Sequence, residues 1–568
     1  MKKIISILFI ICSLFSSMAY AQGGLTYSGT VIGEDGFELI GVSVAVKGTS
    51  IGVITDLDGK FRLNNIPPKS TIVFSYVGFE NKEVKITESK ERETIVLKQS
   101  ISSLDEVVVV GRGSQRKVSV VGAIPSVDPA QLQVPATSVS NMLQGRVPGI
   151  IGVTRRGEPG NNFSEFWVRG ISTFGAGAGA LVLIDGIEGN LNTLDPEDIE
   201  SFSILKDASS TAVYGVRGAN GVVLVTTKKG KAGKLNLQVK ANAGISYSPR
   251  MLDFVNAAQY AQLANEASVT RGGIPIYTDV DLALYANHMD PDLHPDVNWK
   301  DVILKDYTWN QQYFLSASGG GEVARYYISA GYTTKDAIFK QDKGVNRYNT
   351  NVNYNKFNFR ANVDVNVTPT TTLSLNEETV IVTQNYPGFG NDSKRLWEAQ
   401  SSLTPVTVPL MYTTGQAPGY GTNKSTISPY VLMNMTGYRK LYANNNKITM
   451  QLNQDLKAIT PGLSIMGLFN IDSNSSHTQI REKLPAIYYA NGRKRDGTLD
   501  MEKVIDAQEP SYNRLTENDR KFYYEFRLNY DRVFDKVHRV GALVNAYWSD
   551  FESSKFGELL TAIPKRYN

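Results

Sequence analysis

The segment from Lys356 to Val367 alternates polar and apolar side chains without a break. A period of two describes a β-strand with one apolar and one polar face. The segment is about twice the usual globular strand of roughly 5–6 residues, and it matches the roughly 9–11 residues that a tilted strand needs to cross a bilayer. It therefore predicts a strand that presents one face to lipid and the other to water.

The same alternation recurs along the second half of the chain, in the segments 235–245, 448–453 and 522–531. We expect about nine long strands from Lys234 onward. Tight connections near 319–322, 368–370, 459–462 and 535–537 alternate with long ones near 247–306, 334–351, 383–445 and 474–519. This rhythm is typical of an up-and-down membrane barrel whose tight turns face the periplasm. A large soluble β-sandwich or adhesin is the alternative, although its strands are rarely this long.

The distribution of tyrosine agrees with a membrane barrel. Of the 29 tyrosines, 21 lie from Tyr307 onward. Tyrosine is enriched at the ends of membrane strands, where its amphipathic ring meets the headgroup layer. The sequence therefore predicts a mainly β protein with an incomplete antiparallel transmembrane β-barrel over residues 233–568.

The first 21 residues have the pattern of a secretory signal peptide. Lys2 and Lys3 precede an apolar stretch, which ends in the small-residue site Ala19-Tyr20-Ala21. The single cysteine, Cys12, lies inside this stretch, and a lipoprotein signal is the alternative reading. Removal of the two lysines lowers the formal net charge from +4 to +2, and so small a charge implies no nucleic-acid partner.

Residues 22–100 contain seven short strand-like runs separated by turn residues such as Asp58-Gly59 and Pro67-Pro68. The runs cover residues 27–32, 42–46, 52–55, 60–63, 71–76, 82–86 and 93–97. This spacing predicts a small antiparallel β-sandwich of roughly 75 residues. The segments Gly41-Val42-Ser43-Val44 and Thr55-Asp56-Leu57-Asp58-Gly59 resemble the carboxypeptidase-regulatory-like domain.

Residues 113–232 are rich in glycine and predict a compact α/β unit. Asp195 can cap a helix that starts at Pro196. Asp207 can cap a second short helix through Val213, which Gly215 would end. Residues 222–227 are apolar enough for a buried strand.

A strand-forming linker, residues 101–112, lies between the predicted sandwich and this unit. It contains Leu104-Asp105-Glu106-Val107-Val108-Val109-Val110. Valine favours strands, but these valines have little to pack against. Read alone, the segment predicts an ordinary linker strand. In its context it resembles a TonB box, which implies that it adds as a strand to the periplasmic protein TonB through main-chain hydrogen bonds.

The glycine-rich unit resembles the plug domain of the SusC/RagA family of TonB-linked outer-membrane receptors. The matching motifs include Gln144-Gly145-Arg146-Val147-Pro148-Gly149, Val168-Arg169-Gly170, Leu183-Ile184-Asp185-Gly186, Ile204-Leu205-Lys206-Asp207, Ala212-Val213-Tyr214-Gly215 and Arg217-Gly218-Ala219-Asn220-Gly221. Glycines such as Gly215, Gly218 and Gly221 allow sharp turns and close approach to a barrel wall. Arg169, Lys206, Asp207 and Arg217 are expected to pair with the polar wall rather than to contact a ligand.

The resemblance implies a receptor that imports bulky nutrients, either glycans or peptides, across an outer membrane. It also implies TonB with its inner-membrane ExbB/ExbD complex, a SusD-like surface lipoprotein and outer-membrane lipid as partners. Receptors of this kind need about 22 strands to hold a plug, so nine strands suggest a fragment, a frameshifted product or half of a split gene. A signal-transducing receptor and a secreted β-rich adhesin remain as alternatives.

The sequence predicts no enzyme, cofactor site or metal site. Gly48-Thr49-Ser50-Ile51-Gly52 fits a nucleophile pattern, but it lies among short strands and no histidine precedes His288. The alternating glycines at 175–180 precede a strand, whereas a dinucleotide loop links a strand to a helix. Asp56 and Asp58 lack the later ligands of a calcium loop. The four histidines form no ligand motif.

Overall fold

A computed structural model describes residues 24–33, 38–49, 51–56, 58–76, 79, 81–98, 107–110, 113–116, 126–127, 138–168, 170, 179–207, 211–248, 253–345, 348–388, 394–534, 538–554 and 566–567. The predicted signal peptide, the predicted residues Leu104, Asp105, Glu106 and Arg169, and the predicted turn at 535–537 lie outside these ranges. The chain divides into two compact units, Met1–Ala123 and Ile124–Asn568.

The first unit contains the predicted sandwich. One sheet has the order β4-β1-β7 and the other the order β3-β2-β5-β6. The strands are β1 (Leu25–Gly33), β2 (Ser43–Val46), β3 (Gly52–Ile54), β4 (Lys60–Ile66), β5 (Ser70–Ser75), β6 (Lys82–Ile86) and β7 (Lys90–Leu97). Tyr27, Phe61 and Phe74 pack together in the core, with ring centroids 5.2 to 6.4 Å apart. All seven predicted strands are confirmed.

The sandwich differs from the prediction in one pairing. β1 and β7 run parallel, whereas we expected an antiparallel arrangement throughout. The physical reason is the crossover between β6 and β7, which belong to different sheets. A chain that changes sheets is not bound to the antiparallel direction that a tight hairpin imposes.

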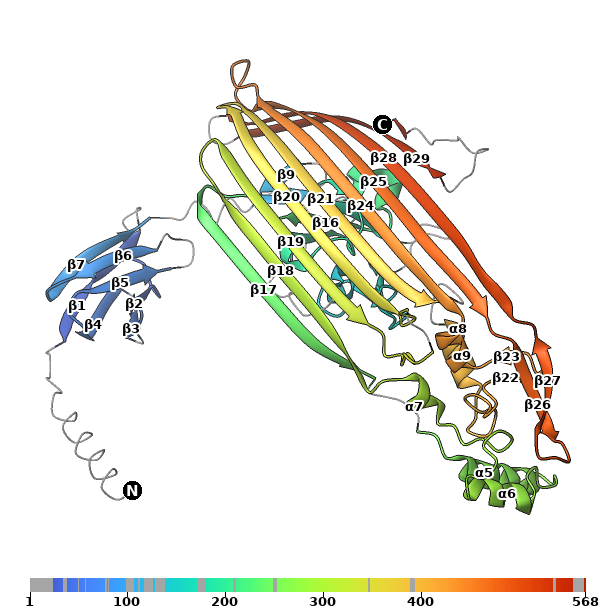
Figure 1. The fold of residues 1–568 in the computed structure, drawn as a ribbon. Coiled ribbons are helices and arrows are strands. Elements are labelled where there is room, and N and C mark those ends of the chain that lie inside the picture. Colours follow the sequence, from blue (N-terminus) through green and yellow to red (C-terminus); the bar gives the residue numbers. More distant parts are fainter. Residues whose placement is uncertain are drawn as a thin grey trace, which may run out of the picture. The chain divides into compact units, whose positions relative to one another are not determined.

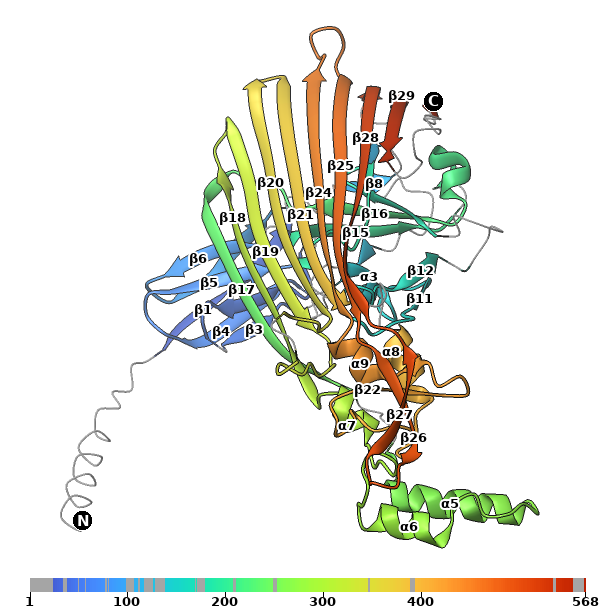
Figure 2. The ribbon, with the colours of Figure 1, turned by 45° about the vertical axis from the view of Figure 1, so that its right-hand side comes forward.

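Nine long antiparallel strands and the two-residue β30 (Arg566–Tyr567) form the main sheet of the second unit (Figures 1 and 2). The long strands are β17 (Gly233–Tyr247), β18 (Tyr307–Gly320), β19 (Ala324–Asp336), β20 (Asn353–Thr368), β21 (Thr371–Pro387), β24 (Gly437–Asp455), β25 (Leu463–Leu484), β28 (Gln508–Phe534) and β29 (His538–Ser553). The expected count of long strands is confirmed. Among the described residues the sheet is open, with β17 at one edge and β30 at the other.

Burial in this sheet is the reverse of burial in a soluble protein. On β20 the polar residues Lys356, Arg360 and Asn362 are 2 to 4% exposed, whereas Phe357 is 39% exposed. The polar face meets the plug, and the apolar face has no protein layer over it among the described residues. Only a surrounding apolar medium makes such an arrangement favourable, because exposed apolar surface is costly in water. The predicted alternation is confirmed with this polarity.

The plug lies against the polar face of the main sheet (Figure 1). Its central sheet has the order β10-β15-β16-β13-β14. The strands are β10 (Ser126–Val127), β13 (Leu181–Ile184), β14 (Ile187–Glu188), β15 (Ile199–Leu205) and β16 (Val222–Thr227), beside a hairpin of β11 (Ile150–Val153) and β12 (Glu165–Val168) and the short helix α3 (Val139–Leu143). A core that includes Phe202, Ile204 and Val223 holds the sheet together. The predicted buried strand at 222–227 is β16.

The two predicted plug helices are 3-10 turns, and residues 208–210 of the second prediction lie outside the described ranges. Asp195 does cap a helix, accepting a hydrogen bond from the Glu197 amide, but this helix is a single 3-10 turn, η3 (Pro196–Asp198). The second, η4 (Ala212–Gly218), consists of 3-10 turns interrupted at Gly215, where φ is +55°. The first helix ends where β15 begins at Ile199, whereas the second continues past Gly215, its expected end, to Gly218.

The long connections of the sheet fold into a layer of their own at one end of the strands (Figure 2). This layer contains α5 (Ala257–Thr270), α6 (Asp279–Ala286), α7 (Trp299–Ile303), α8 (Lys394–Ser401), α9 (Pro429–Asn434), β22 (Ala417–Tyr420), β23 (Thr426–Ile427), β26 (Ile487–Arg493) and β27 (Leu499–Ile505). A shared apolar core that includes Trp299, Phe339, Val431 and Ile487 joins four connections. No helix in the described ranges is long and apolar enough to cross a membrane.

The predicted long loop at 474–519 is wrong in part. β25 and β28 continue as a paired ribbon through Glu482 and Ser511, and only the hairpin of β26 and β27 lies between them. The hydropathy pattern concealed this extension because residues 473–483 are mostly polar on both faces. Cross-strand hydrogen bonds do not require apolar side chains, so the ladder continues after the apolar pattern ends.

Gly221 supplies a test of plug packing. Its φ is +86°, and a Cβ added there would lie 2.7 Å from the Val168 Cβ. Gly221→Ala should therefore lower the free energy of unfolding of the plug by about 1–3 kcal/mol, through backbone strain and overpacking. Gly244→Ala in β17 is the control, since its Cβ would meet nothing within 4 Å. Protease cleavage of the plug at increasing urea concentrations measures the stability of both variants. Cleavage of the two variants at the same urea concentration contradicts the prediction.

Candidate functional site

The linker valines form a strand in the first unit. β8 (Val107–Val110) pairs antiparallel with β9 (Gly113–Arg116) in a two-stranded sheet. Among the described residues no further strand pairs with β8. A two-stranded hairpin alone is marginally stable in water. The segment thus has the secondary structure that strand addition requires, and it already uses one of its two edges.

Asp185 and Gly186 form the tight turn between β13 and β14. Their φ angles are +49° and +86°, which an Asp-Gly pair tolerates in a two-residue hairpin. The Asp185 carboxylate also accepts hydrogen bonds from the Thr227 amide at 2.9 Å and the Thr227 hydroxyl at 2.7 Å. These two motif residues therefore set the geometry of the central plug strands.

The other motif residues of the plug also have structural contacts. The Lys206 ammonium group donates to the Pro148 carbonyl, and the Arg217 guanidinium pairs with Glu188. Both of these partners belong to the plug; pairing with the polar wall stays a prediction. The Asp207 carbonyl accepts from the Thr211 amide at 3.0 Å. Tyr214 packs on an apolar cluster, which consists of Leu181, Leu183, Leu205, Val222 and Leu224. Asn220 is buried, and Gly170 has a φ of +104°. A Cβ at Gly218 would lie 2.9 Å from the Thr211 carbonyl oxygen.

Asp198 of η3 is the centre of the contact between plug and sheet. Its carboxylate accepts hydrogen bonds from the Tyr327 hydroxyl at 2.9 Å and the Ser329 hydroxyl at 2.6 Å, both on β19. Arg360 on β20 lies 3.5 Å from Asp198 and 2.6 Å from Glu378 on β21. Arg360 and Glu378 are themselves buried. Two neighbouring strands, β19 and β20, thus contact one plug carboxylate, and Arg360 also links β20 to Glu378 of β21.

The loop before η3 binds the sheet through its carbonyl groups. The Lys356 ammonium group lies 3.2 Å from the Asn192 carbonyl oxygen and 3.3 Å from that of Leu194. Asn358, next on the same face of β20, donates to the Thr193 carbonyl. These bonds satisfy main-chain acceptors that burial would otherwise leave without partners.

A second charged contact joins the plug to the far side of the sheet. Glu188 of β14 pairs with Lys521 of β28 at 2.8 Å and with Arg217 of the plug. Burial acts to raise the pKa of Glu188, but hydrogen bonds and charge from Lys521 and Arg217 outweigh it and lower the pKa to about 2. At Asp195 the balance is opposite: burial, together with the charge of Asp198, raises the pKa to about 6.

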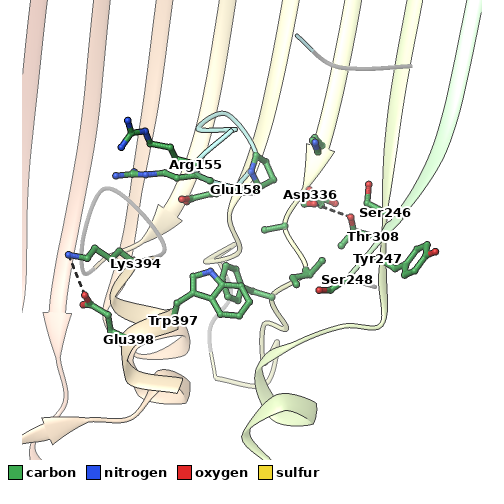
Figure 3. Close-up of a pocket in the computed structure, with 17 residues that line it drawn as sticks. Arg155, Glu158, Ser246, Tyr247, Ser248, Thr308, Asp336, Lys394, Trp397 and Glu398 are labelled. Atoms are coloured by element: carbon green, nitrogen blue, oxygen red, sulfur yellow. Dashed lines mark hydrogen bonds and ion pairs between the residues drawn. The ribbon is translucent and has the colours of Figure 1, made fainter. Parts of the chain in front are cut away.

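An open pocket of about 630 Å³ lies between the plug and the layer of long connections (Figure 3). The plug supplies Arg155 and Glu158 from the loop between β11 and β12, and α8 supplies Lys394 and Trp397. Trp397 is 39% exposed and packs against Phe339 with ring centroids 5.5 Å apart. An aromatic face beside charged groups suits a ligand with both polar groups and apolar surface.

The residues that join the plug to the sheet were not singled out from the sequence. Asp198, Glu188, Arg360 and Glu378 carry these contacts, and Trp397 lines the pocket. The available signal was the polar face of each long strand, since Lys356, Asn358, Arg360 and Asn362 recur at every second position of β20. Which of them meets the plug depends on tertiary placement. The described residues contain no group of three or more His, Cys, Asp or Glu side chains that could hold a metal ion.

Comparison with known proteins finds family models for two segments of the chain. Residues 27–109 match the CarboxypepD_reg-like domain, and residues 116–222 match the TonB-dependent Receptor Plug Domain. The chain is 39% identical to TonB-dependent receptor P39 of Formosa agariphila over 350 residues, which are 61% of this chain and 32% of that protein. It is 32% identical to TonB-dependent receptor SusC of Bacteroides thetaiotaomicron over 362 residues, 61% of this chain and 34% of SusC. The chain is a homologue of the TonB-dependent receptors.

Solved structures agree on the fold. The RagAB peptide importer in its open-open state superimposes with a TM-score of 0.61 at 22% identity, over 79% of this chain and 49% of that chain. The closed-closed state of the same importer gives a TM-score of 0.60 at 21% identity, over 77% and 48% of the two chains. This chain spans about a third of the length of the curated relatives it matches. These relatives are receptors of the outer membrane rather than enzymes.

Loss of the Arg360 charge tests the central contact. Arg360→Met leaves Asp198 and Glu378 buried together without their shared cation, which should destabilise docking of the plug by about 3–5 kcal/mol. Hydrogen exchange of the amides of β15 and β16 measures the loss as faster exchange. The control is Arg495→Met, which removes an exposed arginine from the loop between β26 and β27. Unchanged protection in Arg360→Met contradicts a stabilising role for this contact.

The lowered pKa of Glu188 predicts an acid-sensitive contribution to stability. Because the folded pKa of about 2 lies below the unfolded value, the contribution is complete above about pH 4.3 and is lost as the pH falls towards 2. Glu188 is 39% exposed, so screening reduces the contribution to about 1–2 kcal/mol. Glu188→Gln should lower the free energy of unfolding at pH 7 by this amount and weaken its decline between about pH 4.3 and pH 2. Glu398→Gln on α8 is the control, and an unchanged pH profile in Glu188→Gln refutes the assignment.

Proposed function

We propose that this chain acts in TonB-dependent import of bulky nutrients, either glycans or peptides, across the outer membrane. One observation carries the proposal: long strands with an apolar outer face hold a plug on their polar inner face. This arrangement suits a protein that closes a membrane passage and opens it on demand. Residues 1–21 would direct export, and residues 22–112 would lie in the periplasm.

The proposed route of energy transfer starts at residues 104–110. TonB adds a strand to the second edge of β8, and the ExbB/ExbD complex supplies the work from the inner-membrane proton gradient. Main-chain hydrogen bonds give strand addition its affinity without demanding particular side chains. Pulling on this segment acts on the plug, which follows it directly in the chain.

The contacts of the plug with the sheet suit such movement. They are mainly hydrogen bonds and ion pairs, such as those of Asp198 and Glu188. Water can replace these partners when the plug moves, because a net hydrogen bond between protein groups contributes only about 0.5–1.5 kcal/mol once exchange with water is counted. An apolar interface of the same size would have no such substitute. The plug is therefore held firmly but remains displaceable.

We place ligand binding at the pocket beside Trp397, between the plug loop at 155–159 and the layer of long connections. Its volume of about 630 Å³ is enough for part of a bulky ligand, with the rest extending outward. The names of the relatives support the ligand class: RagAB is a peptide importer. A SusD-like lipoprotein would cover the layer of long connections and retain the ligand.

Deletion of residues 104–110 tests this function in cells that express the protein from its own gene. Uptake of the nutrient should fall to the level of a strain without the gene, because TonB has no strand to pair with. Ligand binding at the cell surface should remain, since the pocket lies elsewhere in the chain. Retained uptake refutes the proposal. A proline-rich linker of the same length, substituted for residues 104–110, controls for spacing and should also abolish uptake, because proline lacks the main-chain N–H group that strand addition needs.

A further inference from the structure

Lys335 of β19 brings a cation into the open pocket beside Trp397. Tyr327 and Ser329 donate to Asp198 and therefore lie on the inner face of β19, and Lys335 lies on that same face because side chains alternate along a strand. Within the described ranges its ammonium group forms no hydrogen bond or ion pair. A partly buried cation without a partner is unfavourable unless an anion from outside lies against it.

Other charged groups of the pocket are already paired. Lys394 and Glu398 form an ion pair along α8 at 3.3 Å (Figure 3). Arg155 of the plug loop pairs with Glu165 of β12 at 3.1 Å. These groups can still contact a ligand, but their charges are balanced without one.

The remaining charges of the lining leave an excess of positive charge. Arg156 and Glu158 of the plug loop carry opposite charges. Asp336 is exposed and, as the next residue after Lys335, lies on the outer face of β19. Four cations and three carboxylates line the pocket in all. The pocket therefore favours a ligand with a negative charge, and Lys335 is where that charge is needed.

Trp397 gives the pocket a flat aromatic surface (Figure 3). The ring packs against Phe339 and is still 39% exposed. One side of a pyranose ring presents apolar C–H groups, which stack on such a surface. Sugar hydroxyl groups also need both donors and acceptors, and the hydroxyl groups of Ser246, Ser248 and Thr308 in the same lining can be either.

An extended peptide would instead need free main-chain groups along the wall of the pocket. The Ala337 amide donates to the Val352 carbonyl at 2.9 Å, and the Ile338 carbonyl accepts from the Lys305 amide at 2.7 Å. These main-chain groups are thus already bonded. What the pocket offers is an aromatic ring, hydroxyl groups and an ammonium group, and this set fits an acidic sugar better than a peptide.

We propose that the pocket binds an acidic oligosaccharide. The Lys335 ammonium group binds the carboxylate of a uronic acid unit, and a sugar ring of the ligand stacks on Trp397. A single ammonium group matches the single charge of a carboxylate, and the charge-assisted hydrogen bond between them is short and strong. The inference rests on the proposed function, because it names the ligand of the proposed import, but binding is measured without transport.

The test measures binding to the purified chain in detergent by isothermal titration calorimetry. The probes are tetramers of galacturonate, glucuronate and mannuronate, each compared with its methyl ester, which keeps the sugar backbone and removes the charge. At least one acidic tetramer should bind about ten- to hundredfold more tightly than its ester, because hydrogen bonds to charged groups are the stronger ones. The proposal is overturned if none of the three tetramers binds, or if all bind no better than their esters.

Lys335→Gln should remove this preference. Affinity for the acidic tetramer should fall about ten- to hundredfold, whereas affinity for the ester should not change. The matched control is Lys457→Gln, which removes the same charge from an exposed position in the tight turn between β24 and β25 and should change neither affinity. An unchanged preference in Lys335→Gln overturns the proposal.

Trp397→Ala tests the stacking. It should weaken binding of the acidic tetramer and of the ester alike, by about tenfold. Unchanged affinity in this variant overturns the proposal. If Lys335→Gln does not fold, added salt on the unmodified chain takes its place: affinity for the acid should fall and affinity for the ester should not, and equal responses overturn the proposal.

Two further probes separate the uronate from other anions. Tetraglutamate offers the same carboxylates on a peptide, and a sulfated galactose tetramer offers a different anion on a sugar. Both should bind more weakly than the preferred uronate tetramer. Tighter binding of either one overturns the proposal in favour of an acidic peptide or a sulfated glycan.

Uptake of the preferred tetramer separates the inference from the proposed import. A chain that binds the tetramer through Lys335 but still takes it up after deletion of residues 104–110 supports the inference and refutes the proposed function. A chain whose uptake of a nutrient requires residues 104–110 but which binds acid and ester equally gives the opposite result.

Discussion

The polar contact between plug and sheet is the interaction on which the second unit depends. Lys356, Asn358, Arg360 and Asn362 are buried on β20 only because plug groups supply their partners. A buried amide or charge without a partner is costly, and several in a row would destabilise any sheet. The plug is therefore as necessary to the inner face of this sheet as an apolar medium is to its outer face.

Because the sheet needs plug groups at fixed positions, the motif residues of the plug set its backbone shape and packing rather than carry out a reaction. Asp185 and Gly186 shape a hairpin, and a Cβ on Gly149 would lie 2.8 Å from the Lys206 ammonium nitrogen. Their contacts determine where Glu188 and Asp198 lie, and these two carboxylates then meet the sheet. The arrangement gives a unit that is rigid within itself and attached to its surroundings by bonds that water can replace.

The layer of long connections adds a third element to this arrangement. Its apolar core links connections that are far apart in sequence, around Trp299, Phe339, Val431 and Ile487. A shared core of this kind makes the connections move together rather than as separate loops. The pocket beside Trp397 lies where this layer meets the plug, so a ligand there contacts both elements at once.

The sequence by itself determined the nine long strands, their two faces, the seven strands of the sandwich and the plug motifs. Each of these is a local pattern: a period of two, a turn residue or a motif read within a few positions. Tertiary structure alone decided that β1 and β7 are parallel, that β25 and β28 continue as a polar ribbon, and that Asp198 meets the wall. These features depend on which segments come together in space, and hydropathy carries no signal for a ladder or a polar contact whose partners lie tens of residues to more than a hundred residues apart.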